Sequence, residues 1–595
     1  FVSLTLLGLM ATCVLAASGP TGSQTPPVSS GERWVRQSQY ITVRDGTRLA
    51  ADIIRPVRDG AVVTQPLPVV WILHRYGRAS IQNGSVQTIV DQSPWLRTLL
   101  EHGYIIVAVD ARGSGASFGS DQGMLAPAAK ADTYDVTEWL AAQPWSDGNI
   151  GMFGRSYMGA VQYIAASMAP PHLRAIFPEM FGFDMYTGFL PGGIPRSGFL
   201  PGVETIIKVM DRGMGAVPVD DDPHGTELAR AVEEHRANAY GLAAAAQLPF
   251  RDEWLDANGQ EIWAAGSPSP IRDAINRSNI PIFHLGGWYD TTAGDTPVWY
   301  ANLDNPQRLI MGPWYHGDNI PQYDGSAHLR WFDYWLKNID NGIMAEPPIS
   351  YFTIGAPAGQ EWRSTWDWPP PNAQATNFYL RAGPTGTIAS ASDGSLSLQA
   401  ASQKVESDTY VVNYDSTSGQ AGRWAFVLPG TTRRTDMSEL DRTGLTYTTL
   451  PLPTDIEITG YPIVHLWVTA SAPDADFFVF LQDIDAKGAS RPIGDGALRA
   501  SYRATAKPPF ENFGQPYHTG LRSDVAPLPP EPVELAFSLN PTSYIVHAGH
   551  RLRLTITGAD RGAAQTPVQS PPPTVQIFRG SEHSSRITLP IVPSR

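Results

Sequence analysis

The stretch "NIGMFGRSYMGAVQYIAASMA" (149–169) decides the fold, because an apolar strand-like run meets a helix-like run at a single serine. The run "IGMF" ends at Gly154, and Ser156 precedes a helical pattern that two prolines stop at residue 170. A serine on a tight strand-to-helix turn projects its hydroxyl outward, and the helix N-terminus favours developing negative charge there. Serine is equally a common helix cap. Both interpretations of Ser156, nucleophile and cap, stay open from this stretch alone.

The small residues around Ser156 have an unusual spacing. The common hydrolase elbow is G-x-S-x-G, whereas this chain has G-x-S-x-x-G, with Met158 in the usual small-residue place and Gly159 one position later. The turn needs small residues because it crowds Cβ atoms against neighbouring backbone. Gly-x-Ser by itself is a weak signal in a chain with 55 glycines, since residues 115–117 and 488–490 match it too.

Strands and helices alternate on both sides of this stretch. Short apolar runs predict buried strands at 67–73 and 104–110, and the α/β pattern resumes in the stretches 280–290 and 307–316. Helical patterns such as 132–143 lie between strands, an alternation typical of a parallel sheet with helices on both faces. The sequence therefore predicts an α/β domain made of residues 33–180 and 279–347.

Two further regions have different sequence patterns. Residues 181–278 contain helical patterns that interrupt the α/β alternation, which predicts a helical cap inserted over a site. Beyond the prolines at 347 and 348 the apolar period becomes two, as in "RLRLTITG" (551–558), while "DFFVFLQD" (476–483) is apolar on both faces. Many short strands with Gly/Pro turns predict a β-sandwich or jelly roll over 348–595.

Composition excludes several classes of function. The chain has 595 residues, 42% of them hydrophobic and 17% charged, which is typical of globular domains. A net charge of −14 without a basic block argues against a nucleic-acid partner, because phosphate binding needs a clustered positive surface. No His/Cys cluster has metal-ligand spacing, so we expect neither a metal nor another cofactor.

The first residues, "FVSLTLLGLMATCVLAASGP", resemble the apolar core and cleavage zone of a secretory signal, so residues 1–18 are expected to be a signal peptide with a truncated start. Its removal leaves no membrane segment and predicts a secreted or periplasmic protein. Cys13 is the only cysteine, which leaves the mature protein without a disulfide or a thiol nucleophile. Lipid attachment at Cys13 is an alternative, although Thr12 is a poor neighbour for it.

An elbow serine needs a base and an orienting acid, expected later in the chain in the order Ser, Asp, His. Asp290 ends "GGWYD" after the strand 280–285, and His316 ends "GPWYH" after the strand run at 307–311. Both follow the carboxyl ends of predicted parallel strands, where open α/β sheets place their sites. Taken separately, Asp290 is a common turn residue and His316 a common loop residue. Their order in the chain after Ser156 is what favours a catalytic triad. Weaker candidates are His284 and His465 for the base, and Asp295 and Asp318 for the acid.

The motifs "GRSYMG", "GWYD" and "GPWYH" resemble those of the cocaine-esterase-like (CocE/NonD) serine hydrolases, in the X-prolyl dipeptidyl peptidase superfamily. That superfamily also contains cephalosporin acylases and α-amino acid ester hydrolases. "DARGSGASFG" (110–119), "EWLAAQPWSDGNIG" (138–151) and "AGHRLRL" (548–554) are similar to the family as well. The resemblance covers nearly the whole mature chain. It implies an α/β-hydrolase domain with an inserted helical cap and a C-terminal jelly roll.

The resemblance also implies roles for individual residues. Ser156 matches the family's nucleophile, Asp290 its orienting acid and His316 its general base. The family's oxyanion hole uses a tyrosine hydroxyl after an early strand, which matches Tyr76 in "HRYGR" (74–78), together with the backbone N–H of Tyr157. Here Arg75 stands where the family usually has a proline before that tyrosine, which removes one source of stiffness from the loop.

The substrate is a small ester or amide by this resemblance, and the cap is expected to shape the choice. Met158, two residues after the nucleophile, offers no carboxylate for a substrate amine. An acidic run, Asp220–Asp222, is a weak candidate for binding such an amine, and a solvated loop is the alternative. Trp288 and Trp314 are candidates for an aromatic acyl pocket together with Met158, and a packing role for both tryptophans is the alternative.

We therefore expect an esterase or acylase that forms an acyl-enzyme on Ser156. The alternatives are an X-Pro dipeptidyl peptidase, a β-lactam acylase or α-amino acid ester hydrolase, and a catalytically inactive binding protein. Dipeptidyl peptidases of this superfamily tend to have a further N-terminal helical domain, for which the chain has no room before residue 33. The sequence leaves homo-oligomer formation open.

Overall fold

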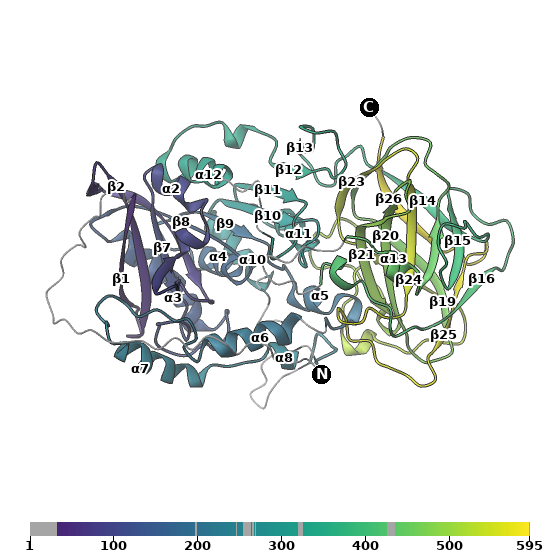
Figure 1. Cartoon of the computed structure of the whole chain (residues 1–595), viewed down its shortest axis with the longest axis horizontal. Coiled ribbons are helices and arrows are strands. Elements are labelled where there is room, and N and C mark those ends of the chain that lie inside the picture. The colour runs from purple at the N-terminus through teal and green to yellow at the C-terminus, as the bar shows by residue number, and fades with distance from the viewer. Residues whose placement is uncertain are drawn as a thin grey trace.

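The computed structural model describes residues 33–593, apart from 197–198, 246, 254–262, 264–266, 268, 319–324 and 425–434. The expected signal peptide lies outside the described residues. An α/β part and an all-β part lie side by side along the long axis of the molecule (Figure 1). These two parts agree with the predicted fold class.

An 11-stranded mixed sheet is the centre of the α/β part. From edge to edge its strands are β1 (Trp34–Thr42), β2 (Arg48–Arg58), β7 (Ile105–Asp110), β4 (Leu67–His74), β8 (Ser146–Arg155), β9 (Leu173–Glu179), β10 (Ile282–Gly287), β11 (Gln307–Gly312), β12 (Ile349–Phe352) and β13 (Trp362–Thr365), with β3 (Ala61–Val62) paired to β2. Neighbours from β7 to β12 run parallel, and the edge pairs are antiparallel. The carboxyl ends of β8, β9, β10 and β11 therefore meet at one edge, where the candidate site residues follow.

Helices cover both faces of this sheet, because its strands are apolar on both sides. One buried cluster includes Trp71 and Trp299 and takes residues from α3 (Pro127–Ala141), α4 (Tyr157–Met168), α10 (Arg272–Ser278) and α11 (Asp295–Ala301). The other includes Phe177 and Trp331 and takes residues from α1 (Ile89–Gln92), α2 (Leu96–Glu101) and α12 (Ser326–Lys337). The hairpin β5 (Ala79–Gln82) and β6 (Ser85–Thr88) precedes α1.

The segment between β9 and β10 is helical, as the sequence predicts. It contains α5 (Met185–Phe189), α6 (Phe199–Met210), α7 (Thr226–Glu234) and α8 (Leu242–Ala245), with 3₁₀ turns at Pro191–Gly193, His235–Ala237 and Ser269–Ile271. In Figure 1, α6, α7 and α8 run along the lower side of the α/β part. Helix α10 ends this segment and packs against α4, so residues 272–278 belong structurally with the sheet rather than with the cap.

The all-β part is a 13-stranded sheet folded around one large apolar cluster. Its strands are β14 (Gln374–Arg381), β15 (Ser392–Ser397), β16 (Ser407–Val411), β17 (Leu445–Thr448), β18 (Ile456–Gly460), β19 (Ile463–Ala470), β20 (Asp476–Ile484), β21 (Ser490–Arg499), β22 (Val533–Ser538), β23 (Thr542–Val546), β24 (Arg551–Thr557), β25 (Thr574–Phe578) and β26 (Arg586–Val592). A short helix, α13 (Ser438–Asp441), lies between β16 and β17 in the chain.

The α/β sheet extends beyond residue 348, where the sequence places the domain boundary. Strand β12 pairs in parallel with β11, and β13 returns antiparallel to β12, so the sheet ends at Thr365. The prolines at 347 and 348 directly precede β12 and do not separate two domains. Proline has no N–H to donate within a sheet, and before the first residue of a strand this costs no hydrogen bond between strands. The first strand of the all-β part begins at Gln374.

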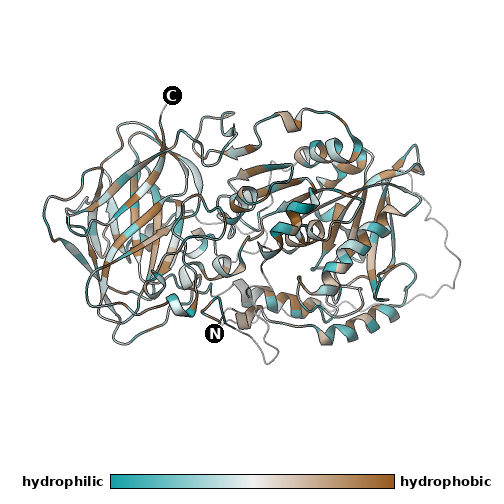
Figure 2. Cartoon of the chain, turned by 180° about the vertical axis from the view of Figure 1, so that it is seen from behind, coloured by the Kyte–Doolittle hydropathy of each residue, from teal (hydrophilic) through white to brown (hydrophobic). Residues whose placement is uncertain are grey.

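Apolar residues gather along the central strands of both sheets, and hydrophilic ones dominate outward helices such as α7 (Figure 2). Within the part of the chain that the structure describes, we find no helix with the length and apolar character needed to cross a membrane.

Candidate active site

The turn between β8 and α4 holds Ser156 in a strained backbone conformation. Its φ is 61° and its ψ −127°, a combination that non-glycine residues avoid. Gly154 has a φ of 141°, which glycine adopts most readily. The Ser156 side chain makes no capping hydrogen bond to α4, although the residue occupies the cap position. The structure therefore favours the outward-facing elbow over the simple helix cap.

The neighbours of Ser156 explain the G-x-S-x-x-G spacing. A Cβ on Gly159 would lie 2.7 Å from the Glu179 carbonyl oxygen, so glycine is required where α4 passes β9. A Cβ on Gly154 would lie 2.6 Å from the Cβ of Met158. Met158 packs against the buried cluster that contains Phe153, so its place is in the core rather than in an open pocket.

The amide of Tyr157 opens α4 beside the serine. The first N–H groups of an α-helix have no acceptor within the helix. The Ser156 amide donates to the Glu179 carbonyl at 2.9 Å, which anchors the turn to β9. The Tyr157 N–H therefore lies at the positive end of the helix, next to the serine that bears the hydroxyl.

Asp290 and His316 form a hydrogen-bonded pair at the ends of β10 and β11. Asp290 Oδ2 lies 2.7 Å from His316 Nδ1, and Asp290 is fully buried. Thr292 donates to Asp290 Oδ1 from its amide at 2.7 Å and from its hydroxyl at 2.5 Å. Burial alone would raise the pKa of Asp290, but the His316 imidazole and the Thr292 donors outweigh it and lower that pKa. Asp290 is thus a carboxylate that orients His316.

Arg155 connects this pair to the serine turn. Its Nη1 donates to the carbonyl oxygen of Asp318 at 2.9 Å and to that of His316 at 3.4 Å, while Nε lies 3.3 Å from Glu179. Because Arg155 precedes Ser156 directly, these bonds hold the backbone of His316 beside the elbow. The structure thus brings Ser156, Asp290 and His316 to one edge of the sheet.

Arg155 and Thr292 also support the site, and neither belongs to the predicted triad. Thr292 had a usable signal, because a hydroxyl two residues after an aspartate commonly bonds its carboxylate. Arg155 had none, since the position between glycine and serine in the elbow accepts any residue type.

The weaker candidates have other partners. The carboxylate of Asp318 accepts the Tyr315 amide at 2.9 Å, which is a turn contact. His284 is buried against Tyr163 and Gln307, and His465 pairs with Glu534 in the all-β part. Asp295 lines a cavity instead, and burial, then the charge of Asp184, raises its pKa to about 7.

Tyr76 lies just beyond β4, in the loop expected to supply an oxyanion donor. Its amide donates to His74 Nδ1 at 3.1 Å. Burial lowers the pKa of His74 to about 4, against the opposing effect of Asp110, so the imidazole stays neutral and can accept. Burial also raises the pKa of Tyr76, which keeps its hydroxyl protonated and able to donate. Burial, and after it nearby groups that include Tyr76, raises the pKa of Tyr157, so the two tyrosines lie near each other.

The two candidate pocket tryptophans have packing roles. Trp288 is buried, donates from Nε1 to the Phe352 carbonyl at 2.7 Å and stacks on Trp368. Trp314 lies in the same buried cluster as Phe177, and its ring fills the space that a side chain on Gly312 would need. Of the two interpretations left open from the sequence, packing is the one that the structure supports for both.

The acidic run before α7 is structural as well. Asp220 accepts the Ser38 amide at 2.7 Å and an Arg36 nitrogen at 3.1 Å, which ties the cap to β1. Asp222 is buried and accepts the Leu228 amide at 2.8 Å in the first turn of α7. These carboxylates are occupied by the fold, so they are not free for a substrate amine.

A cavity of about 210 Å³ opens between α5, the loop after Asp290 and the all-β part. Aromatic side chains line much of it, and its charged groups are Asp184, Asp295, Arg423 and Asp495. Arg423 reaches the Thr291 carbonyl at 3.0 Å and the Asp290 carbonyl at 3.4 Å. The all-β part therefore contacts the acid loop directly. Within the described residues no group of three His, Cys, Asp or Glu side chains could hold a metal ion.

Comparison with known proteins gives the family. Residues 45–318 match the sequence model of the X-Pro dipeptidyl-peptidase (S15 family), and residues 341–588 match that of the X-Pro dipeptidyl-peptidase C-terminal non-catalytic domain. A Mycobacterium bovis protein named "Putative serine esterase" is 30% identical, over 97% of this chain and 98% of its own length. Cocaine esterase of Rhodococcus is 28% identical, over 94% of this chain and 99% of its own.

Solved structures share the fold at lower identity. A CocE/NonD family hydrolase from Staphylococcus aureus has a TM-score of 0.68 at 20% identity and covers 93% of each chain. An α-amino acid ester hydrolase has a TM-score of 0.70 at 20% identity, over 96% of this chain and 98% of its own. The chain therefore belongs to the X-Pro dipeptidyl-peptidase (S15) superfamily that includes the CocE/NonD hydrolases, and it is a serine hydrolase.

Proposed function

We propose that the protein cleaves carboxylic ester bonds, or related amide bonds, of small acyl substrates through an acyl-enzyme on Ser156. The observation that carries this proposal is the hydrogen-bonded pair of buried Asp290 and partly exposed His316, which Arg155 holds beside the strained serine turn. A nucleophile, a base and an orienting acid at one sheet edge are the groups that acyl transfer requires.

The chemistry follows from the polarity of the pair. Asp290 accepts the Nδ1–H of His316, which leaves Nε2 as the proton acceptor. Ser156 Oγ attacks the acyl carbon while Nε2 takes its proton, and the same proton then passes to the departing alcohol or amine. Water attacks the acyl-enzyme, giving its proton to Nε2, and collapse of the second intermediate releases the acid and restores the serine hydroxyl.

Two donors are placed to stabilise the negative oxygen that forms at each step. They are the Tyr76 hydroxyl, whose raised pKa keeps it protonated, and the Tyr157 N–H at the start of α4. Loss of one such donor typically lowers kcat on the order of 10²–10³. Tyr76→Phe is therefore expected to lower kcat by that factor for an aryl ester, with KM changed much less. An unchanged kcat would remove Tyr76 from the site.

An ester is the favoured substrate class. The position two residues after Ser156 is a methionine, which offers no carboxylate for a substrate amine, and Asp220 and Asp222 are engaged in the fold. Two relatives carry esterase names. The alternative of an X-Pro dipeptidyl peptidase draws its support from the names of both family models.

A substrate panel separates these two activities. p-Nitrophenyl acetate and butyrate, a benzoyl ester, glutaryl and phenylglycyl amides, and Ala-Pro-p-nitroanilide are compared by kcat/KM. We expect one of the esters to be turned over best, and preference for the Ala-Pro anilide would establish the peptidase instead.

Ser156→Ala tests the nucleophile itself. It is expected to abolish ester hydrolysis and labelling by a fluorophosphonate probe, while circular dichroism shows a folded protein. Turnover retained in this variant would refute the assignment. Failure of the wild type to be labelled or to turn over any ester would favour the inactive binding protein.

We also propose that the protein is exported, on the basis of the apolar N-terminal segment. N-terminal sequencing of protein recovered from the periplasm or medium is expected to begin after the signal, near residue 17. Recovery of the uncleaved chain from the cytoplasm alone would contradict export.

A further inference from the structure

Tyr76 lies between two buried arginines in the loop "HRYGR" (74–78). Arg75 and Arg78 are 3% and 1% exposed. Gly77, between Tyr76 and Arg78, has a φ of 89°, so the chain turns sharply there. The side chains of Arg75 and Arg78 therefore hold this loop in place, one on each side of Tyr76.

Arg75 points into the cap. Its Nη1 and Nη2 donate to the two carboxylate oxygens of Asp211 at 2.6 and 2.8 Å, and its Nε donates to Asp121 at 3.0 Å. Asp211 follows α6 directly and is 2% exposed. A planar guanidinium that meets a carboxylate through two parallel bonds is fixed in both position and orientation.

A closed ring of hydrogen bonds surrounds this ion pair. Asn238 donates from its amide nitrogen to Asp211 at 2.8 Å and accepts the Asp121 amide at 2.7 Å, while Asp121 in turn receives Arg75. Tyr240 adds a bond from its hydroxyl to Asp211 at 2.9 Å. Every charge in the ring has a partner, as a buried ionic network requires to be rigid.

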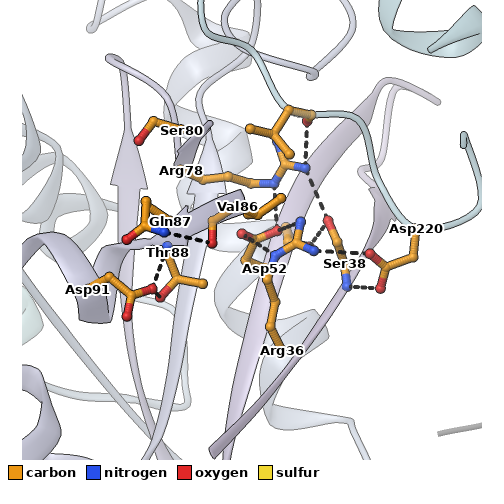
Figure 3. Close-up of polar contacts among 12 residues, drawn as sticks. Arg36, Ser38, Asp52, Arg78, Ser80, Val86, Gln87, Thr88, Asp91 and Asp220 are labelled. Carbon is orange, nitrogen blue, oxygen red and sulfur yellow. Dashed lines mark hydrogen bonds and ion pairs between the residues drawn. The ribbon is translucent and has the colours of Figure 1, made fainter. Parts of the chain in front are cut away.

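Arg78 fixes the other side of the loop. Its Nε donates to Asp52 at 2.8 Å, and its amide and Nη1 both donate to Asp110, each at 2.6 Å. Its Nη2 donates to Ser38 at 3.1 Å and to the cap carbonyl of Val217 at 2.9 Å. Figure 3 shows Arg78 directed at Asp52 and Ser38, beside the cap loop that carries Asp220.

Asp220 completes the attachment of the cap, through its bonds to Arg36 and the Ser38 amide (Figure 3). Arg36 in turn pairs with Asp52, the carboxylate that Arg78 also uses. Residues 211–220 of the cap are therefore bonded to the sheet and to Arg75 and Arg78, the two arginines of the Tyr76 loop.

We propose that Arg75 and Asp211 are positioning residues that hold the Tyr76 hydroxyl in the oxyanion site and make its position depend on the cap. The inference rests on the proposed role of Tyr76. In place of a proline, whose ring stiffens a loop covalently, the chain uses a bidentate ion pair to a second structural unit. A shift of the cap near Asp211 is thereby transmitted to the oxyanion donor.

The test is a double-mutant cycle between Arg75 and Tyr76. Arg75→Met keeps the bulk of the side chain and removes its bonds. We expect it to lower kcat for p-nitrophenyl acetate by about 10- to 100-fold, the range that a misplacement of about 1 Å can cause. In the Tyr76→Phe background the same change is expected to cost less than 3-fold, because the hydroxyl that Arg75 positions is already gone.

A merely structural role gives a different result. If Arg75→Met lowers kcat by the same factor with and without the Tyr76 hydroxyl, or leaves kcat unchanged, the proposal is overturned. Should Arg75→Met fail to fold, Asp211→Asn and Arg75→Lys provide the same cycle with hydrogen bonding partly kept. Arg75→Pro is expected to recover more kcat than Arg75→Met, since it restores local stiffness.

Arg553→Met is the matched control. The Arg553–Asp441 pair is as buried as Arg75–Asp211 but lies in the all-β sheet, with Nη1 to Oδ2 at 2.8 Å. This variant should lower the melting temperature and leave kcat below that temperature unchanged. Activity retained in Ser156→Ala would instead contradict the proposed function, so the two failures are distinguishable.

Discussion

Asp290 keeps a negative charge where it has no exposed surface, and its partners account for this. Burial acts to raise the pKa of Asp290, while His316 and Thr292 act more strongly to lower it. A depressed carboxyl pKa stabilises the folded state above the unfolded value of about 3.9, and that stabilisation is lost as pH falls through the folded value. The Asp290 carboxylate is therefore also a source of stability at neutral pH.

Two substitutions distinguish the effect of the Asp290 charge from the effect of the Thr292 hydrogen bond to it. Asp290→Asn is expected to lower kcat on the order of 10⁴, because the amide favours the wrong imidazole tautomer. Thr292→Val removes the hydroxyl donor alone, with a cost of about 1.5–3 kcal/mol in the free energy of unfolding at pH 7 and a smaller loss of kcat. Urea denaturation and ester kinetics measure the two effects. Equal losses of kcat in Asp290→Asn and Thr292→Val would contradict the prediction that Thr292 acts mainly on stability.

Asp295 behaves in the opposite way, since its pKa is raised to about 7 by burial and by Asp184. Its carboxyl binds more protons in the folded state than in the unfolded state between about pH 4 and 7, so stability falls as pH rises through that window. Asp295→Asn removes this dependence. The difference in melting temperature between this variant and the wild type should increase in favour of the variant by about 2–4 °C from pH 5 to pH 8. A constant difference across that range would exclude a raised pKa.

At the scale of elements, α4 is placed by its glycine. Gly159 lets the helix pass within contact of the β9 backbone, which keeps the elbow serine at the sheet edge. Gly202 in α6 also lies within a helix, but nothing lies within 4 Å of where its Cβ would be. The same residue type is thus required in one helix and dispensable in the other.

These two glycines give a paired prediction. Gly159→Ala should destabilise the protein by about 1–3 kcal/mol, because backbone cannot move aside for the new methyl group. Gly202→Ala should stabilise it by about 0.5–1 kcal/mol, since alanine loses less entropy in a helix. Urea denaturation gives both values, and a tolerated Gly159→Ala would show that α4 can shift without cost.

The elements themselves were predictable wherever one pattern dominated. The apolar runs at 67–73 and 104–110 predicted β4 and β7, because strands buried on both faces need apolar residues at every position. In "RLRLTITG" arginines and apolar residues alternate, and the structure buries Arg553 against Asp441 and Thr448. A buried ion pair between residues 112 positions apart leaves no local signal.

At the scale of the molecule, Arg423 joins the all-β part to the catalytic edge. It pairs with Asp495 and donates to the carbonyls of Asp290 and Thr291. Those carbonyls belong to the loop that orients the Asp290 side chain toward His316. The all-β part therefore contacts the acid loop through Arg423, and also through the Pro492 carbonyl, which accepts the Tyr289 hydroxyl at 3.2 Å.

Arg423→Met is expected to lower kcat by about 10-fold, because the acid loop loses its outer support while the triad residues remain. Arg499→Met, which breaks the pair with Asp476 elsewhere in the all-β part, is the control and should leave kcat unchanged. Ester kinetics at a temperature well below melting distinguishes them. Equal losses in the two variants would mean that the all-β part acts through its overall stability alone.

The ordered Ser, Asp and His positions could be predicted because each follows a parallel strand. The support around them could not, since Arg75, Arg155 and Arg423 act through partners from distant segments. Chain position likewise misplaced the boundary at residue 348, because β12 and β13 are too short for their pairing to be inferred from sequence. The roles of Trp288 and Trp314 could not be decided from the sequence, because the burial of each side chain depends on residues outside its local motif.

Strands β9 and β10 are hydrogen-bonded neighbours, although one ends at Glu179 and the other begins at Ile282. During synthesis the serine turn leaves the ribosome with half of the sheet, and the acid and base follow only after the whole insertion has been translated. Closing so long a loop slows the addition of β10. A nascent chain released before that point would contain the Ser156 turn and lack both Asp290 and His316.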